Sequence, residues 1–453
     1  MTFRTSMSFM CVLMFCSQAA AGAQALDQSS TAPLALTVDD AVARGITEAP
    51  RLAEARARAD AASATVASRE ALGRPTLTAT AGLLRTNHVD EFGIPQANGT
   101  TRVIFPDIPN NYRARAELSM PLFTSGRVGD LVASAQAERR AVDADRKVAT
   151  SDLTLEIETA YWTLALARER TTVLERALQR ADVSLADVRA RFESGVLPPN
   201  DVQSAQAQRA RQRVQLIQAR NDAAIAEAEL ARLVGAPGGQ PIVLLTAVDR
   251  PTPGAAELTA LPLATLTGRA TESRPERLAL AERQVSLQSA ADAAAAAMRP
   301  QIGVLAAVEP ARPNSRFVPR VDQWNTGWDL GVNVTWALWD GGRSRADRAA
   351  ALAQSAALRE RTADFDALVG VEVQKRLLDV TSAREALVAS NEAVDAAAEA
   401  RRVLGERFSA GVATNADVLD ADLAWLEAEL ERTRLTVSLR LGEARLLRSA
   451  GQR

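Results

Sequence analysis

A twelve-residue segment occurs twice in this chain, and the second copy lies 216 positions after the first. RFESGVLPPNDV occupies residues 191–202, RFSAGVATNADV occupies residues 407–418, and six of the twelve positions are identical. Further upstream, PLFTSGR (121–127) and ALWDGGR (337–343) match at the same offset. A repeat of this length indicates two copies of one structural unit, so the fold is predicted to consist of two equivalent halves.

Nearer the N-terminus the halves align at an offset of 225 instead of 216. At this offset Pro50 pairs with Pro275, and Arg74-Pro75 pairs with Arg299-Pro300. The first half therefore carries nine additional residues between Pro75 and Pro121. Length differences of this kind are usually found in surface loops.

The repeat and the positions of Pro and Gly predict four segments along the 453 residues. They are a signal peptide (1–23), a first repeat (24–235), a connector (236–260) and a second repeat (261–453). Each repeat is expected to contain a helix, two strands, a long helix, a turn and a helix. The Pro/Gly-rich connector is expected to contain one short strand, Ile242–Val248.

The first residues are typical of a secretory signal peptide, with Arg4, an apolar core from Met7 to Phe15, and small residues before the cleavage site. Cleavage is expected after Ala23 or Ala25. A lipoprotein signal ending at Cys16 is the alternative, although Phe15 then occupies a position that needs a small residue.

Both cysteines, Cys11 and Cys16, lie within this segment, so the mature chain is expected to form no disulfide and to bind no metal through thiolates. The formal net charge of −2 gives no basic surface that would favour nucleic acid. No later stretch is long and apolar enough for a transmembrane helix.

Long helices are predicted on both sides of each repeated turn. No proline interrupts residues 127–192 or 343–408, and 66 residues of good helix formers give a rod of about 100 Å. The helix after the second turn has a coiled-coil seam: Leu419, Leu423, Leu426, Leu430, Thr433 and Val437.

The turns carry the residues that end and restart helices. Gly195 and Gly411 permit a positive φ where a helix stops. Pro198 and Pro199 favour a restart in the first repeat, and Asn415 or Asp417 provides a cap in the second. Thr37-Val-Asp-Asp40 predicts a capping box at the start of the first helix.

Between the helices lie segments of about ten residues that alternate between apolar and polar side chains, as in transmembrane β-strands. Their apolar positions are Leu77, Ala79, Ala81 and Leu83; Tyr112, Ala114, Ala116, Leu118, Met120 and Leu122; Ile302, Val304, Ala306 and Val308; and Trp328, Leu330, Val332, Val334, Trp336 and Leu338. Tryptophans at the strand ends favour a membrane interface. A soluble four-stranded sheet packed on its own helices is the alternative.

Four strands cannot close a barrel, and open strand edges cannot face lipid. Two chains would supply eight strands, which side chains fill. Three chains would supply twelve and leave an aqueous lumen, so a trimer is the smallest assembly that forms a channel.

In order and in duplicate, LTVDDAV, PLFTSGR/ALWDGGR and the RFxxGVxxxxDV turns resemble the TolC-like outer-membrane efflux protein family, or outer-membrane factors. The resemblance covers nearly the whole mature chain. It implies a mostly α fold with membrane β: a homotrimer whose 12-stranded β-barrel in the outer membrane continues as an α-helical coiled-coil barrel in the periplasm. It further implies an exit duct for an inner-membrane transporter, reached through a periplasmic adaptor protein, in the outer membrane of a Gram-negative bacterium.

In that family the hairpin tips contact the adaptor. Carried over, this makes the two tips the docking candidates: Arg191, Phe192, Gly195 and Val196, with Arg407, Phe408, Gly411 and Val412. The alternative is that Gly and Val only shape the turn; the two interpretations are balanced for Gly, whereas the exposed Arg favours contact.

Family members also narrow at the periplasmic end through rings of aspartate. The matching positions are Asp417 and Asp420, with Asp201 in the first repeat. Three copies around one axis would concentrate cations and raise their own pKa by repulsion. Helix capping is the alternative role of Asp417 and Asp201. The Tyr and Arg that hold some members shut are replaced here by Phe408 and Ala413, so that hydrogen-bonded closure is absent.

No catalytic site, cofactor or metal is expected, because the only histidine, His88, lies in a predicted extracellular loop and no nucleophile motif or phosphate loop occurs. The rival function is an exported periplasmic coiled-coil scaffold or adaptor without a barrel. An adaptor should have one hairpin between β-rich domains, whereas this chain has two equivalent hairpins.

Overall fold

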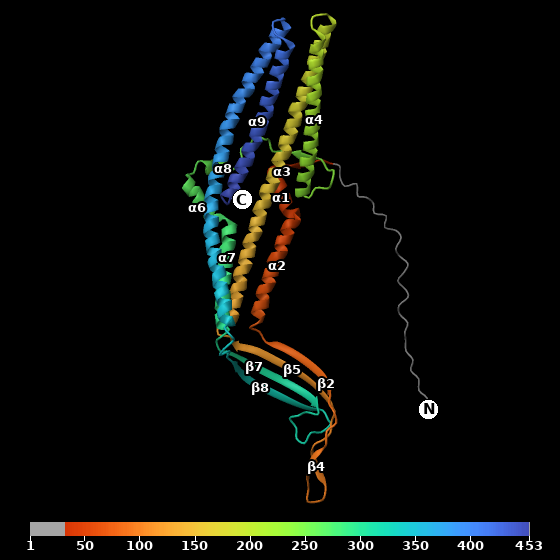
Figure 1. Ribbon diagram of the computed structural model, residues 1–453, viewed down its shortest axis with the longest axis vertical. Helices are drawn as coiled ribbons and strands as arrows, with labels where there is room; N and C mark the ends of the chain where they lie inside the picture. The colour runs from red at the N-terminus through yellow and green to blue at the C-terminus, as the bar shows by residue number, and fades with distance from the viewer. Residues whose placement is uncertain (1–31, 453) are drawn as a thin grey trace, which may run out of the picture.

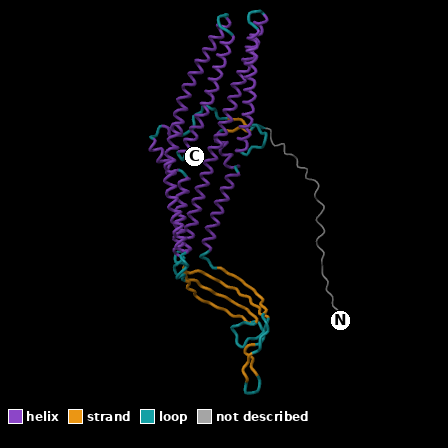
Figure 2. Tube along the Cα trace, viewed as in Figure 1, coloured by secondary structure: helices purple, strands orange, loops and turns teal. Residues whose placement is uncertain are grey.

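The computed structural model describes residues 32–452, so the predicted signal peptide of residues 1–23 lies outside the described part of the chain. The molecule is elongated, with two helical hairpins at one end and a four-stranded sheet at the other (Figure 1). A short two-stranded sheet lies beside the helices between these ends (Figure 2).

The helices follow the predicted repeat. They are α1 (Val38–Glu48), α2 (Pro50–Ala71), α3 (Arg127–Glu193) and α4 (Pro199–Leu233) in the first repeat, α5 (Ala255–Thr259) in the connector, and α6 (Leu263–Ser273), α7 (Pro275–Ala296), α8 (Arg343–Ser409) and α9 (Asn415–Ser449) in the second. None of them is long and apolar enough to cross a membrane.

The strands are β1 (Leu34–Leu36), β2 (Thr76–Arg85), β3 (Phe92–Pro95), β4 (Thr101–Phe105), β5 (Asn110–Phe123), β6 (Ile242–Leu244), β7 (Gln301–Arg312) and β8 (Asn325–Thr335). The large sheet has the order β2-β5-β7-β8, and every neighbouring pair is antiparallel.

The two long helices are confirmed, and each contains 67 residues. Each is preceded by a glycine in the left-handed conformation, Gly126 (φ 91°) and Gly342 (φ 89°), which turns the chain out of the sheet. Together with α4 and α9, which contain 35 residues each, they form the two hairpins. Helix α3 packs on α4, α7, α2 and α9, while α8 packs on α9 and α7.

The helix before each strand pair is interrupted, which the prediction of a single helix missed. Ala49 and Arg274 are extended, and Pro50 and Pro275 each begin a new helix. The residue before a proline is driven out of the α conformation, while proline itself suits the first position of a helix. The predicted capping box of Thr37 and Asp40 is present.

Two strand predictions need correction. The strand predicted to continue to Leu338 ends at Thr335, because β8 is an edge strand and its partner β7 begins at Gln301, opposite Thr335. The loop that contains His88 also includes a hairpin, since β3 pairs with β4. This hairpin lies within the segment that is longer in the first repeat.

The connector is more structured than predicted. Its strand is confirmed but ends at Leu244, and it pairs in parallel with β1, which the sequence did not reveal. Tyr161 of α3 fixes this pair, because its hydroxyl donates to the Leu36 carbonyl oxygen (3.1 Å) and accepts from the Thr246 amide (3.0 Å). The largest apolar core surrounds this point, with Ile157 among its fully buried members.

Candidate functional site: the hairpin tips and the sheet

The two hairpin tips have the same backbone. Gly195 (φ 73°) and Gly411 (φ 77°) are left-handed, as predicted. The Val196 amide donates to the Arg191 carbonyl oxygen (2.8 Å), and the Val412 amide donates to that of Arg407 (2.9 Å). These bonds satisfy carbonyl groups that the end of a helix would otherwise leave free. The repeated motif therefore encodes one turn twice.

The second helix of each hairpin restarts differently. Pro198 and Pro199 begin α4 without a side-chain cap. In the second hairpin the cap is Thr414, and Asn415, which the sequence suggested as a cap, is the first helical residue. Thr414 donates to the Asp417 carboxylate from its hydroxyl (2.7 Å) and its amide (2.8 Å). These hydrogen bonds lower the pKa of Asp417, opposite in direction to the repulsion expected in a ring.

Arg191, a docking candidate, joins the two tips to each other. Its guanidinium lies 4.6 Å from the centre of the Phe408 ring and donates to the Phe408 carbonyl oxygen (3.4 Å). Its Nε also donates to Asp187 (2.9 Å). Phe408 is 9% exposed as a result. The expectation of a freely exposed arginine is therefore wrong for Arg191.

The remaining tip residues are open to solvent. Phe192 is 41% exposed, and Val196 and Val412 are 68% and 63% exposed. The Arg407 side chain is exposed and forms no ion pair or hydrogen bond within residues 32–452. Arg191 and Phe408 therefore contact each other in the described chain, whereas the equivalent residues Arg407 and Phe192 do not.

The three candidate carboxylates start the returning helices. Asp201 is half-buried in the first turn of α4, where its carbonyl oxygen accepts from Asn415 Nδ2 (3.3 Å). Asp417 is used in the cap, whereas Asp420 is exposed on α9 and forms no ion pair in the described chain. No group of three acidic, His or Cys side chains among residues 32–452 is arranged to hold a metal ion.

Below the tips, Trp425 of α9 lies between two arginines, an arrangement that sequence reasoning missed. The guanidinium of Arg180 on α3 lies 4.0 Å from its ring centre and that of Arg401 on α8 lies 4.7 Å away. Arg401 also donates to Asp422 (2.5 Å). Burial lowers the pKa of Arg180. Stacking of this kind ties the first hairpin to the second.

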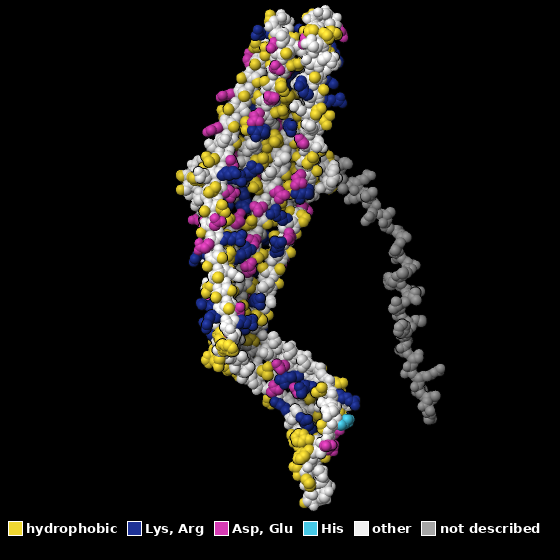
Figure 3. Space-filling view, in the orientation of Figure 1, with side chains coloured by type: hydrophobic (Ala, Val, Ile, Leu, Met, Phe, Trp, Pro, Cys, Tyr) yellow, Lys and Arg dark blue, Asp and Glu magenta, His cyan; other side chains and the backbone are white. Residues whose placement is uncertain are grey.

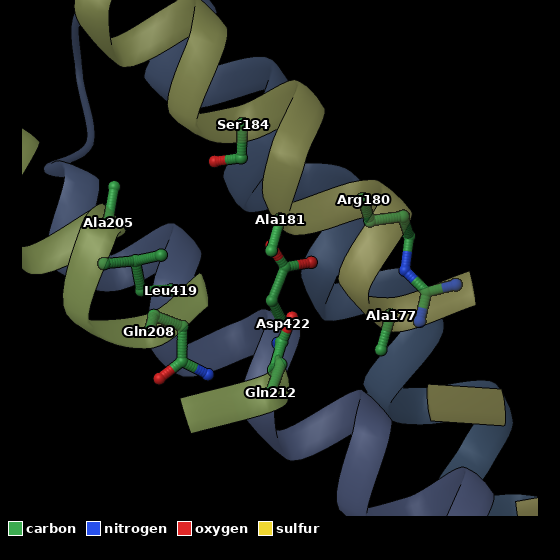
Figure 4. A pocket seen from close by; sticks show the side chains of 9 residues that line it. All are labelled: Ala177, Arg180, Ala181, Ser184, Ala205, Gln208, Gln212, Leu419 and Asp422. Atoms are coloured by element: carbon green, nitrogen blue, oxygen red, sulfur yellow. The ribbon is translucent and has the colours of Figure 1, made fainter. Parts of the chain in front are cut away.

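A small polar pocket lies beside this stack, between α3, α4 and α9 (Figure 4). Its polar lining includes Ser184, Gln208, Gln212 and Asp422. Both glutamines are buried although they belong to a helical hairpin, where an apolar seam is usual. The contact between the hairpins is therefore partly polar.

At the other end of the molecule, the sheet has one apolar face. The strand register brings the predicted apolar positions together on this face. Its exposed large side chains are Leu77, Leu83, Tyr112, Leu118, Met120, Val308, Trp328, Leu330, Val332 and Val334. The described helices leave this face uncovered, so the alternative of a sheet packed on its own helices is wrong. An exposed apolar area of this kind indicates contact with lipid or protein.

The opposite face of the sheet carries an ion-pair network, which the sequence did not predict. Arg115 of β5 donates to Glu117 (3.0 Å), to Glu309 on β7 (3.2 Å) and to Asp329 on β8 (3.2 Å). Arg113 lies 3.4 Å from the Glu309 carboxylate. Basic and acidic side chains gather over this part of the sheet in Figure 3. One arginine thus connects three strands.

The sequence matches the outer membrane efflux protein family over residues 44–236 and 266–452. The chain belongs to this family, whose members are channels rather than enzymes. Membership confirms the predicted resemblance and the predicted location, the outer membrane of a Gram-negative bacterium with the helical part in the periplasm.

The same architecture occurs in solved structures of low sequence identity. A membrane protein from Pseudomonas aeruginosa is 20% identical, with a TM-score of 0.73 and coverage of 91% of this chain and 92% of that one. The outer membrane protein VceC from Vibrio cholerae is 18% identical (TM-score 0.74; 91% and 96%). The open state of the MtrE outer membrane channel from Neisseria gonorrhoeae is 19% identical (TM-score 0.71; 91% and 88%). No curated protein matches the sequence.

Proposed function

We propose that this protein is the outer-membrane exit duct of a tripartite efflux or type I secretion system. In this proposal three copies share a 12-stranded β-barrel in the outer membrane, and their hairpins form a continuous helical barrel in the periplasm. A periplasmic adaptor connects this duct to an inner-membrane transporter. The proposed units of each chain are residues 24–235 and 261–453, joined by the connector of residues 236–260.

The observation that carries the proposal is a four-stranded sheet with an apolar face and two open edges. Within residues 32–452, β2 and β8 each pair on one side only. Backbone groups at an open edge cannot be left unpaired in lipid, so a sheet of this kind requires other copies to complete it. Three copies give twelve strands and a water-filled interior, toward which the Arg115 network would face.

The test is the mass of the protein extracted by detergent from the outer-membrane fraction, measured by light scattering. Three chains per particle are expected. A monomer, or protein recovered only from the soluble periplasmic fraction, would contradict the barrel and leave the exported helical scaffold as the function.

For docking, we propose that the adaptor contacts the exposed part of the tips, namely Val196 and Val412, together with Phe192 and Arg407. The exposed valines support this assignment, because both tips present the same apolar side chain at the same position of the same turn. Gly195 and Gly411 shape the turn, while Arg191 and Phe408 hold the tips together.

Introducing a charge at the exposed tips tests docking without disturbing folding. Val196→Asp combined with Val412→Asp is expected to abolish export while leaving the mass of the trimer unchanged, since neither side chain is buried in the chain. Val183→Asp, at an equally exposed position on α3 more than two turns before the tip, is the matched control. Normal export by the double variant would exclude docking through the valines.

A further inference from the structure

A cleft with three cations lies where α1 and α2 meet α3, away from both the tips and the sheet (Figure 1). Its volume is about 430 Å³, which is within the range of small-molecule sites. Its polar lining consists of Arg56, Arg146, Lys147, Thr150 and Ser151. Within residues 32–452 no Asp or Glu lines this α2–α3 cleft, so the cleft is positively charged although the whole chain has a formal net charge of −2.

The bend between α1 and α2 provides the apolar part of the cleft. Ala49 is extended before Pro50, so one helix ends and the next begins at this point. Ile46 lies just before the bend and Leu52 just after it; Leu52 belongs to the largest apolar core, and Ile46 packs against that core. Both side chains line the cleft, so a ligand would meet apolar as well as cationic groups.

The cations of the α2–α3 cleft are exposed and have no ionic partner. In the part of the chain that the structure describes, none of the three forms an ion pair, whereas the neighbouring Arg51 reaches Glu156 (3.4 Å). The Ser151 hydroxyl also has no hydrogen-bond partner among the described residues. Lys147 and Ser151 are four positions apart on α3 and therefore share one face. Like charges held together without a counter-charge repel each other.

The second repeat shows that the fold does not need these cations. The offsets of 225 for α2 and 216 for α3 give the equivalent positions on α7 and α8. The counterparts of the three cations are all uncharged: Ala281, Thr362 and Ala363 for Arg56, Arg146 and Lys147, respectively. The same helices therefore pack without any of the three positive charges.

The equivalent place in the second repeat is also electrically balanced. Leu52 and Thr150 correspond to Arg277 and Asp366, and these two form an ion pair (2.9 Å) between α7 and α8. One repeat thus has a paired arginine and aspartate where the other has a cleft with unpaired cations. A requirement other than helix packing is needed to explain the excess charge in the first repeat.

Packing between helices does not cover these positions. Helix α3 has a helix on each side, α2 and α7, and Arg146 and Lys147 remain exposed. Helix α7 lies between α3 and α8, and Ala281, the counterpart of Arg56, is exposed as well. The cations therefore lie on the surface of the helical layer, where a ligand can reach them from water.

We propose that the α2–α3 cleft binds the phosphate group of a small, water-soluble phosphate monoester. Such a group carries about two negative charges at neutral pH and presents three acceptor oxygens. The three cations would donate charge-assisted hydrogen bonds to these oxygens, and the Ser151 hydroxyl would donate another. Ile46 and Leu52 would contact the apolar part of the esterified molecule. A carboxylate has one charge and two oxygens, so it matches this set of donors less well.

The position of the cleft favours a ligand from water over a lipid headgroup. Arg146 lies 19 positions after Arg127, the first residue of α3, which places it about 30 Å beyond the sheet at 1.5 Å per residue. The charge of a membrane surface is screened over about 8 Å at physiological ionic strength. The cleft belongs to a single chain, so the inference does not depend on the trimeric duct.

The test is calorimetric titration of the full-length, detergent-extracted protein with phenyl phosphate, which combines a phosphate monoester with a small apolar ring. Saturable binding of one molecule per chain is expected. Arg146→Gln combined with Lys147→Gln should weaken binding at least about tenfold, because hydrogen bonds from charged groups are lost. The matched control is Arg345→Gln with Arg348→Gln, two exposed arginines on α8 without an ion pair in the described chain, and it should leave the affinity unchanged.

Three further titrations define the ligand. Inorganic phosphate and benzoate should both bind more weakly than phenyl phosphate, since one lacks the apolar ring and the other lacks the second charge. Protein reconstituted into phosphatidylcholine vesicles should bind phenyl phosphate equally well with and without phosphatidic acid in the membrane. Competition by phosphatidic acid would assign the site to a lipid phosphate, and equal binding of benzoate would contradict selection of phosphate.

A thermal melt without ligand separates binding from a structural role. The Arg146→Gln, Lys147→Gln variant should melt no earlier than the unaltered protein, because like charges are removed. A lower midpoint together with an unchanged affinity would assign these cations to stability and overturn the site. The absence of saturable binding by the unaltered protein would overturn it as well. Binding by protein whose mass is that of a monomer would support the site and contradict only the duct.

Discussion

Some residues at the tips are exposed to solvent and also stabilise the local backbone. Thr414 and Asp417, which form a capping box at the start of α9, are the clearest example. Their reciprocal hydrogen bonds fix the first turn of α9 and keep the carboxylate charged. Because the pKa of Asp417 is lowered in the folded chain, the stabilisation is present above its ordinary value of 3.8 and is lost as the pH falls through the folded pKa. The cap is therefore weakened only in acid.

Thr414→Ala is expected to destabilise the start of α9 by about 1 kcal/mol, because the Asp417 amide loses its acceptor. Amide hydrogen exchange at the second tip should accelerate at neutral pH and respond less to acidification than in the unaltered protein. Ser409→Ala is the control, since that hydroxyl only donates to the Gly405 carbonyl oxygen. Equal exchange at the tip in the two variants would contradict a stabilising cap.

The tip turns could be predicted from the sequence, but their asymmetry could not. Gly at position five of the motif accounts for the positive φ in both copies. Both copies also contain Arg-Phe, so nothing local distinguishes Arg191 from Arg407. Arg191 contacts Phe408 because the second tip lies next to it, and this arrangement is determined by tertiary packing.

At the scale of elements, alternation and the absence of proline were sufficient to predict the long helices and the four main strands. Shorter elements were missed or misjudged. Strand β1 contains three residues, too few for a periodic pattern, and exists because β6 lies beside it. The Arg115 network was missed because its members come from three strands, and a sequence shows only one strand at a time.

Arg115→Met is expected to lower the free energy of unfolding, since three carboxylates lose the donor they share. The measurement is the thermal midpoint of the detergent-extracted assembly. Arg113→Met should have less effect, because Arg113 reaches only Glu309 and is largely exposed. Adding Asp329→Asn to Arg115→Met should recover part of the loss. Equal midpoints for the two arginine variants would argue against a network centred on Arg115.

At the scale of the whole molecule, the proposed effect of the aspartates on cation preference depends on how many copies surround the channel axis. One chain places Asp417 and Asp420 on successive turns of α9, and three chains would bring six carboxylates to one aperture. Like charges held together attract cations and oppose each other's ionisation. Capping lowers the pKa of Asp417 within each chain, which counteracts that repulsion.

Replacing both residues, Asp417→Asn and Asp420→Asn, is expected to reduce the preference of the channel for cations. The cap is retained, because an amide oxygen still accepts the hydrogen bonds from Thr414. The measurement is the reversal potential of single channels in a planar bilayer with a salt gradient. Asp39→Asn, on α1 far from the tips, controls for the loss of charge alone. An unchanged reversal potential in the double variant would refute the role of these aspartates.

The two long helices have identical lengths, as do the two helices that return from the tips. In a closed ring of three copies, the tips of the first and second hairpins would alternate. Because the two hairpins have equal lengths, all six tips would end in one plane, and a partner could contact them evenly. Seven residues removed from α3 and seven from α4 would lower every second tip by about 10 Å at 1.5 Å per residue. The tips around the periplasmic opening would then alternate between two heights. A flat partner would contact only three of the six, and solvent would pass between them even with every tip residue unchanged.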